Sequence, residues 1–189
     1  MKEIRNAEIK AKDPAESKAL FLTGVPIVYD TPATIHDPVG EYIEIIQRGA
    51  LDGADLSDVR LFYNHDTNRV PLARTPRTMQ LTVSPVGLEF TAELPNTDEA
   101  RSVYEAVRRG DLTGMSFAFK VPQGGDEYDP ATNTRTIKKI EKVLECSVVP
   151  FPAYPTTSVE ARDIQASSRS RYQAKRQSRI LINQILKVR

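Results

Sequence analysis

Short apolar runs recur along residues 1–161, and turn-forming residues, many of them prolines, separate these runs. Several runs alternate apolar and polar positions, which is the pattern of a β-strand that buries one face. Proline is tolerated in turns and at strand ends but disrupts the interior of a helix. The pattern therefore predicts strands over residues 19–27, 59–64, 78–83, 87–93, 114–121 and 138–149, with Thr136 as an earlier start for the last one.

Two segments carry apolar residues near helical spacing. In residues 97–110, acidic residues occupy the first turn and arginines the last, which suits the helix macrodipole. Asn96 or Thr97 can cap the start of this helix, and Gly110 can end it. Residues 40–51 contain three isoleucines and a tyrosine near the same spacing. The sequence thus predicts one helix over residues 97–110 and another over residues 40–51.

Charge divides the chain into two units. The whole chain has 26 Lys and Arg residues against 25 Asp and Glu residues, a net charge of +1. Residues 162–189 hold eight basic residues and one acidic residue, so this segment carries +7 and residues 1–161 carry −6. Leu181, Ile185 and Val188 lie three or four residues apart, which predicts a short basic amphipathic helix. We therefore expect an acidic domain over residues 1–161 and a basic tail over residues 162–189.

The composition excludes several classes of protein. Hydrophobic residues make up 40% of the chain and charged residues 27%, so a fully disordered chain is excluded. No apolar run approaches the roughly 18 residues of a membrane span, and the charged N-terminus does not resemble a secretory signal. One cysteine, Cys146, excludes internal disulfides and a cysteine-based zinc site. With only two histidines, His36 and His65, we expect neither a metal centre nor a cofactor.

Two residues that could carry acid–base and nucleophilic chemistry lie on predicted strands. His65 falls at the end of strand 59–64, just before a turn, where the strand supports it and one side stays open. Ser116 lies on the face opposite three large apolar residues, and the small residues Gly114 and Ala118 leave room there for another chain. Taken alone, each residue more often has a plain structural role.

A carboxylate on a third strand completes this set. Glu145 lies in the apolar strand 138–149, where an unpaired charge is costly. A histidine is a natural partner, because a carboxylate fixes the imidazole tautomer and stabilises the imidazolium during acyl transfer. Regular alternation places Leu144 and Cys146 on one face of this strand and Val143 and Glu145 on the other. The alternative is an edge-strand glutamate that faces water.

Other hydrolytic chemistries fit the sequence less well. A serine–lysine dyad is disfavoured, because an extended strand separates the Cα atoms of Ser116 and Lys120 by about 13 Å. A metal hydrolase needs ligands that two scattered histidines cannot easily supply. The chain does offer one residue of each kind that a triad of serine, histidine and carboxylate requires.

Four segments, taken in order and spacing, carry a resemblance to a known family. They are Asn64-His-Asp, Gly87-Leu-Glu-Phe, Arg109-Gly-Asp-Leu-Thr-Gly-Met-Ser-Phe-Ala-Phe and Leu144-Glu-Cys-Ser-Val-Val-Pro-Phe-Pro-Ala-Tyr-Pro. This set resembles the tailed-phage prohead proteases, which are capsid-maturation enzymes grouped with the herpesvirus assemblin-type serine proteases. The resemblance covers residues 18–161.

The resemblance implies a mainly β fold of the α+β class, a herpesvirus-protease-like β-barrel with surrounding helices, followed here by the basic helical tail. It implies Ser116 as the nucleophile and His65 as the general base. Glu145 is the third member of the triad by resemblance, and Asp66 and Glu141 are nearby alternatives. The chain departs from the family pattern at Ala118, where glycine is usual, and at Cys146, where an aliphatic residue is usual. A backbone N–H near Ser116 or an arginine would stabilise the oxyanion.

The implied function is a serine endopeptidase of viral capsid maturation. Its substrates would be the scaffold protein or the scaffolding segment of the major capsid protein, inside the procapsid in the host cytoplasm, and also the enzyme itself. The basic tail would dock onto scaffold, with residues 165–170 as an autocleavage site, and a disordered basic end is the alternative. The herpesvirus enzymes dimerise, so the resemblance leaves a homo-oligomer open. No membrane partner is expected.

Two further classes of function compete with this interpretation. A non-enzymatic capsid assembly or scaffold protein could carry a protease-like body in which Ser116 and His65 are remnants. Nucleic-acid binding through the eight basic residues of the tail is disfavoured, because the domain is acidic and the tail has one aromatic residue, Tyr172.

Overall fold

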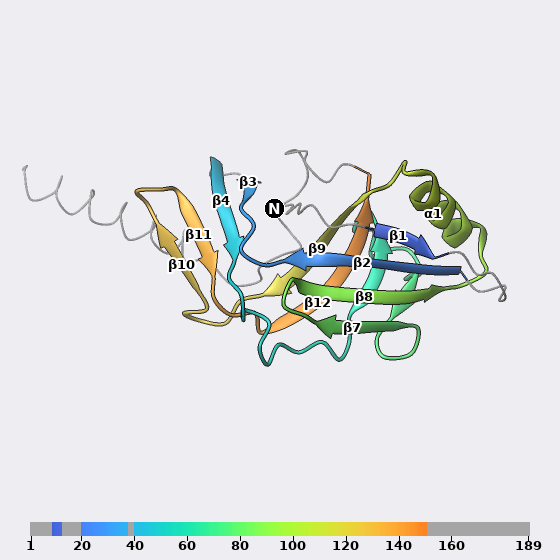
Figure 1. Ribbon diagram of the computed structural model, residues 1–189, viewed down its shortest axis with the longest axis horizontal. Coiled ribbons are helices and arrows are strands. Elements are labelled where there is room, and N and C mark those ends of the chain that lie inside the picture. The colour runs from blue at the N-terminus through green and yellow to red at the C-terminus, as the bar shows by residue number, and fades with distance from the viewer. Residues whose placement is uncertain (1–8, 13–19, 38–39, 151–189) are drawn as a thin grey trace, which may run out of the picture.

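The described strands form three four-stranded sheets, and one helix lies at one end of the molecule (Figure 1). The computed structural model describes residues 9–12, 20–37 and 40–150. The central sheet has the order β6-β5-β12-β9. Its strands are β5 (Arg60–Tyr63), β6 (Ala73–Arg74), β9 (Gly114–Lys120) and β12 (Lys142–Val149). Strand β12 pairs in parallel with β5 and antiparallel with β9. It carries Glu145 and lies between β9, which carries Ser116, and β5, which ends two residues before His65.

The other described strands form two further sheets. The first is antiparallel, with the order β1-β2-β8-β7, and consists of β1 (Ile9–Lys12), β2 (Leu20–Val28), β8 (Gly87–Leu94) and β7 (Met79–Val83). The second has the order β10-β11-β4-β3 and consists of β10 (Asp126–Asp129), β11 (Thr134–Ile137), β4 (Gly40–Ile46) and β3 (Ala33–Asp37). Strand β11 pairs in parallel with β4 there, which makes this sheet mixed.

The main hydrophobic core lies between the central sheet and the sheet of β2 and β8. Strand β9 contributes Phe117 and Phe119, whose rings stack with their centroids 5.2 Å apart. Leu22 of β2 and Phe90 of β8 belong to the same buried cluster, as does Cys146 of β12. One face of β9 and β12 therefore packs in the main core, and the candidate residues Ser116 and Glu145 lie on the opposite face.

Helix α1 (Asp98–Arg109) begins and ends where its local sequence predicts. The Thr97 hydroxyl caps it by accepting a hydrogen bond from the Ala100 N–H, and Gly110 ends it in the left-handed conformation at φ 81°. Its buried face includes Val103 and Val107, which join the main core. The prediction for residues 97–110 is confirmed.

The predicted helix over residues 40–51 is wrong. Residues Gly40–Ile46 form β4, followed by turns, and β4 pairs with β3 on one side and β11 on the other. Its buried positions, Tyr42, Glu44 and Ile46, alternate along the strand. The β-branched isoleucines favour a strand once two neighbouring strands are present to pair with it.

The closed barrel with surrounding helices is also not observed. Among the described residues the strands form three sheets that do not close on themselves, with α1 as the single helix. At the open edge of the central sheet, β9 packs against β2 through side chains that join the main core. The mainly β class is confirmed.

The remaining strand predictions are confirmed with shifted ends, and the strand predicted over residues 138–149 begins only at Lys142. Thr136 belongs to the separate strand β11. The basic tail, residues 162–189, and the joint at residues 165–170 lie outside the described residues, so what the sequence predicts for them stays a prediction.

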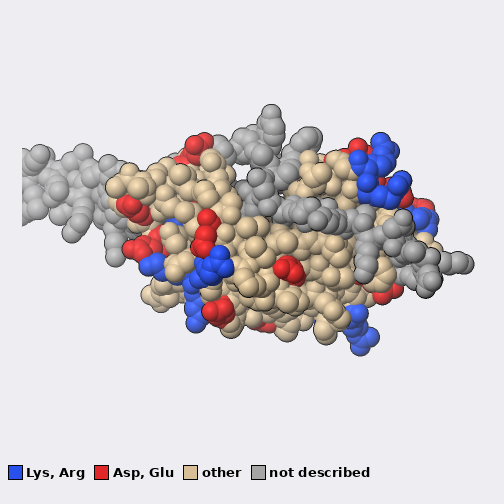
Figure 2. Space-filling view, viewed as in Figure 1, with Lys and Arg blue, Asp and Glu red and all other residues tan. Residues whose placement is uncertain are grey.

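Charged side chains are scattered and intermixed on the face shown in Figure 2. On this face the described residues therefore present no broad basic field of the kind that a phosphate backbone requires. Within the described part of the chain, no helix has the length and apolar character needed to cross a bilayer.

Candidate active site

His65 lies in a tight turn that is anchored to β12. The chain leaves β5 after Tyr63, and both Asn64 and His65 adopt positive φ angles, 53° and 58°. Such angles are uncommon for residues other than glycine and require support from their surroundings. The Asn64 N–H donates to the Val148 carbonyl at 2.9 Å, and the His65 N–H donates to Ser147 Oγ at 3.2 Å. These bonds turn the histidine ring back over β12.

Glu145 of β12 contacts the histidine ring directly. Its Oε1 lies 2.7 Å from His65 Nδ1, and its side chain is 8% exposed. Ser147 Oγ lies 2.5 Å from the other carboxylate oxygen, Oε2, and donates its proton to it. A carboxylate at Nδ1 favours the tautomer with its hydrogen on Nδ1, which leaves the lone pair of Nε2 to accept a proton.

Ser116 is adjacent to this pair through the sheet register. In the antiparallel pairing of β9 with β12, Ser116 is opposite Ser147 and Ala118 is opposite Glu145. Residues directly opposite one another share a face, with Cβ atoms about 4.5–5.5 Å apart. Ser116 is therefore on the face that carries Glu145, directly opposite Ser147, the residue whose hydroxyl contacts both His65 and Glu145. It is buried, with 1% of its surface exposed.

A β-bulge in β12 determines which face Glu145 occupies. Val143 pairs with Phe119, yet Glu145 pairs with Ala118, so Leu144 is an extra residue between them. Without the extra residue, Glu145 would be opposite Phe117 on the core face. The expectation that Val143 shares a face with Glu145 is wrong, because Val143 joins the main core. Bulges that re-aim a side chain in this way are common next to active sites.

A pocket of about 440 Å³ opens beside the histidine and the carboxylate. The described residues that line it come from β5, β9, β12 and the turn after β5. They are Arg60, Phe62, His65, Thr67, Arg69, Pro71, Ala118, Leu144 and Glu145. A peptide side chain that entered this pocket would lie next to the His65–Glu145 contact.

The other carboxylates named from the sequence have different environments. Asp66 accepts hydrogen bonds from the Asn68 N–H and from Arg69 Nε, which keep its carboxylate within its own turn. Glu141 is exposed and precedes β12. Of the three candidates, Glu145 is the one in contact with the histidine ring. The second histidine, His36, lies in β3 of a different sheet.

Cys146 lies beside the site but is unsuited to act as a nucleophile. Its side chain is fully buried in the main core. Burial, and to a lesser degree the charge of Glu145, raises the pKa of the Cys146 thiol well above its usual range. A thiol that stays protonated at neutral pH is a poor nucleophile. In the part of the chain that the structure describes, no group of three or more His, Cys, Asp or Glu residues is arranged to hold a metal ion.

Comparison with known proteins places most of the chain in one family. A family model described as caudovirus prohead serine protease matches residues 5–171. The chain belongs to this family. The resemblance to the tailed-phage prohead proteases is thereby confirmed, and all three candidate residues lie within the matched range.

A named relative supports this membership. The chain is 27% identical, over 138 residues, to the prohead protease of Enterobacteria phage HK97. The matched region covers 71% of this chain and 59% of the length of that relative. No solved structure matches the chain.

Sequence reasoning missed three features of this site. Ser147 was not assigned a contact, although its hydroxyl joins His65 and Glu145. Arg60 lines the pocket and was not singled out. The bulge at Leu144 cannot be predicted from the order of apolar and polar residues in β12, because it depends on which residues of β9 lie opposite.

Proposed function

We propose that this chain is a serine endopeptidase of viral capsid maturation, with Ser116 as nucleophile, His65 as general base and Glu145 as the carboxylate that orients the histidine. The proposal rests on one observation above the others, the 2.7 Å contact between His65 Nδ1 and Glu145 Oε1 on the strand face that carries Ser116. Membership of the prohead serine protease family supports the reaction class.

The reaction follows from these positions. Ser116 Oγ attacks the carbonyl carbon of the scissile peptide bond, while His65 Nε2 accepts the serine proton. Glu145 stabilises the imidazolium that forms. The tetrahedral intermediate then collapses, His65 transfers its proton to the leaving amine, and the acyl group stays on Ser116. Water, deprotonated by His65, hydrolyses this ester and restores the serine.

Ser147 acts as a positioning residue in this scheme. Its hydroxyl holds Glu145 Oε2, which leaves Oε1 directed at His65, and it also accepts the backbone N–H of His65. One buried hydroxyl therefore supports both the carboxylate and the turn that carries the base. Such support keeps catalytic groups within a narrow range of geometries.

Ser147→Ala is expected to lower kcat roughly 10- to 100-fold with little change in KM, since a hydrogen bond to a charged group contributes about 1.5–3 kcal/mol. Ser147→Thr, which retains the hydroxyl, is expected to keep most of the activity. Steady-state kinetics on one peptide substrate measure both variants, and thermal melting confirms their folding. A folded Ser147→Ala protein with unchanged kcat would show that Ser147 does not position the base.

The proposed substrates are the scaffold protein, or the scaffolding segment of the major capsid protein, together with the enzyme itself. The relative from phage HK97 is named a prohead protease, which supports action inside the procapsid, within the host cytoplasm. The basic tail is proposed to dock the enzyme onto scaffold before cleavage. The proposed reaction uses protein side chains and water and calls for no cofactor.

Labelling with a fluorophosphonate distinguishes an active protease from a non-enzymatic assembly protein. The full chain is expected to form a covalent adduct at Ser116, which peptide mass spectrometry locates. Coexpression with the neighbouring capsid and scaffold genes is expected to yield cleaved products whose new termini identify the substrates. Absence of both adduct and processing would favour the assembly protein.

A further inference from the structure

The pocket beside His65 and Glu145 combines apolar walls with two arginines. Phe62 and Ala118 are almost fully buried and form part of its lining with Leu144. Arg60 and Arg69 contribute the positive charge. The two arginines differ in how far neighbouring carboxylates neutralise them.

Arg69 is already paired with two carboxylates. Its Nε lies 3.2 Å from Asp66 Oδ2, and its Nη1 lies 3.4 Å from Glu99 Oε1. One guanidinium thus faces two negative charges, so this corner of the pocket has no positive charge left to attract an anion.

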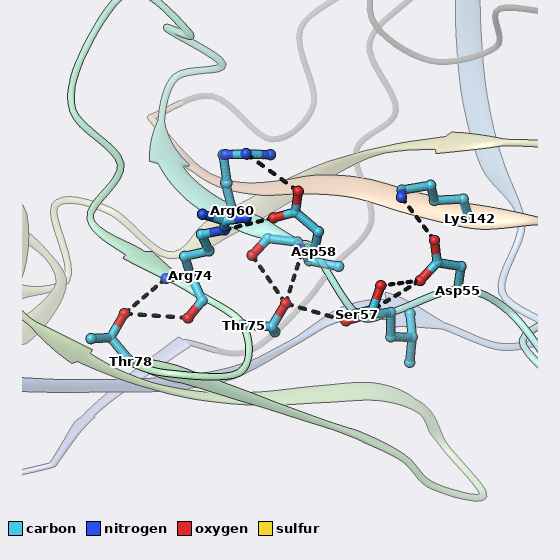
Figure 3. Close-up of polar contacts among 10 residues, drawn as sticks. Asp55, Ser57, Asp58, Arg60, Arg74, Thr75, Thr78 and Lys142 are labelled. Atoms are coloured by element: carbon cyan, nitrogen blue, oxygen red, sulfur yellow. Dashed lines mark hydrogen bonds and ion pairs between the residues drawn. The ribbon is translucent and has the colours of Figure 1, made fainter.

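At Arg60 the ratio is reversed, because two arginines pair with one carboxylate. Its Nη2 lies 3.3 Å from Asp58 Oδ2, while Asp58 Oδ1 accepts a 2.7 Å hydrogen bond from Arg74 Nε. In Figure 3 dashed lines join Asp58 to both arginines, which are directly opposite each other on β5 and β6. The bond from Arg74, with a smaller contribution from the charge of Arg60, holds the pKa of Asp58 below its usual range. Two guanidinium groups therefore share the carboxylate of Asp58, and Arg60, which directs Nη2 at it, has further N–H donors for another acceptor.

The position of Arg60 links this charge to the proposed chemistry. Arg60 is next to Glu145 in the parallel register of β5 and β12, and neighbouring strands lie about 4.8 Å apart. Its side chain is 39% exposed, so a ligand can reach it. The carboxylate of Glu145 is held by His65 and Ser147, which leaves Arg60 available to an incoming group.

We propose that this pocket binds an acidic side chain of the substrate close to the scissile bond, and that Arg60 determines this specificity by pairing with the substrate carboxylate. The apolar walls formed by Phe62, Ala118 and Leu144 pack against the methylene groups of that side chain. A guanidinium suits a carboxylate because its planar fork can donate two parallel hydrogen bonds. The proposal rests on the proposed endopeptidase function and names the class of substrate that its site prefers.

The test uses the full chain and a proteome-derived peptide library, whose cleaved termini are read by mass spectrometry. We expect glutamate or aspartate to be enriched at one position near the cut. Three synthetic peptides that differ only at that position, with Glu, Gln or Lys, then give kcat/KM. The wild-type protein is expected to prefer Glu over Gln by about tenfold or more, the effect of one charge-assisted pair.

Two variants and a matched control connect this preference to Arg60. Arg60→Gln is expected to bring the ratio of Glu to Gln cleavage close to one, and Arg60→Glu to favour the Lys peptide. Arg48→Glu is the control, because Arg48 is also an exposed arginine that pairs with one aspartate, Asp30, outside the pocket. It is expected to keep the wild-type preference.

Labelling of each variant by a fluorophosphonate separates this proposal from the proposed function. Two results would overturn the role of Arg60 but not the proposed function. One is equal cleavage of the Glu and Gln peptides by a wild-type protein that labels, and the other is a preference for Glu retained by Arg60→Glu. A wild-type protein that neither labels nor cleaves would overturn the proposed function and this inference with it.

Discussion

Ser116→Ala is expected to lower kcat for peptide-bond cleavage on the order of 10⁶-fold, the scale found when a serine protease loses its nucleophile. The variant retains His65 and Glu145 in contact, so the base is present but has no hydroxyl to activate. The small side chain of alanine fits a site where Ser116 is 1% exposed and Ala118 already lies two residues along the strand. The loss therefore reports chemistry rather than misfolding.

The measurement is coexpression with the capsid and scaffold genes, followed by mass spectrometry of the products. The Ser116→Ala protein is expected to stay at full length, to leave the scaffold uncut and to lose fluorophosphonate labelling. Ser102→Ala is the matched control, because Ser102 is exposed on α1 and its hydroxyl donates to the Asp98 carbonyl within the helix. Processing that continued in the Ser116→Ala protein would refute the assignment of the nucleophile.

Arg135→Leu is expected to destabilise the fold by about 3–5 kcal/mol, the cost of removing one partner from a buried ion pair. Arg135 of β11 is fully buried and bridges two strands. Its Nη1 lies 2.8 Å from Glu44 Oε2 on β4, and its Nε lies 2.8 Å from Asp126 Oδ2 on β10. Without the guanidinium, both carboxylates lose this positively charged partner, at side-chain exposures of 0% and 1%.

Urea denaturation followed by circular dichroism measures this loss as a change in the free energy of unfolding. Arg101→Leu is the control, because Arg101 is exposed on α1 and pairs there with Asp98. Exposed pairs contribute about 0–1 kcal/mol, so the control is expected to remain near wild-type stability. A loss below about 1 kcal/mol for Arg135→Leu would show that the buried triad is dispensable for stability.

Local signals predicted α1 correctly, because Thr97, the acidic first turn and Gly110 act within a few residues of the chain. The same approach failed for residues 40–51, because β4 gains its stability from pairing with β3 and β11. Arg135 gave no sign of burial in the sequence, since its partners Glu44 and Asp126 come from other strands. In each failure the deciding contacts are distant in the chain.

The candidate site shows the same contrast between local signals and contacts that are distant in the chain. The sequence by itself determined the family, the mainly β class and the residue types of a serine, histidine and carboxylate set, because these depend on motif order and on local alternation. Only the tertiary structure decided that His65 contacts Glu145 across 80 positions, rather than Asp66 one residue away. The physical reason is register: the bulge at Leu144 and the pairing of β12 with β5 and β9 direct these side chains to one face.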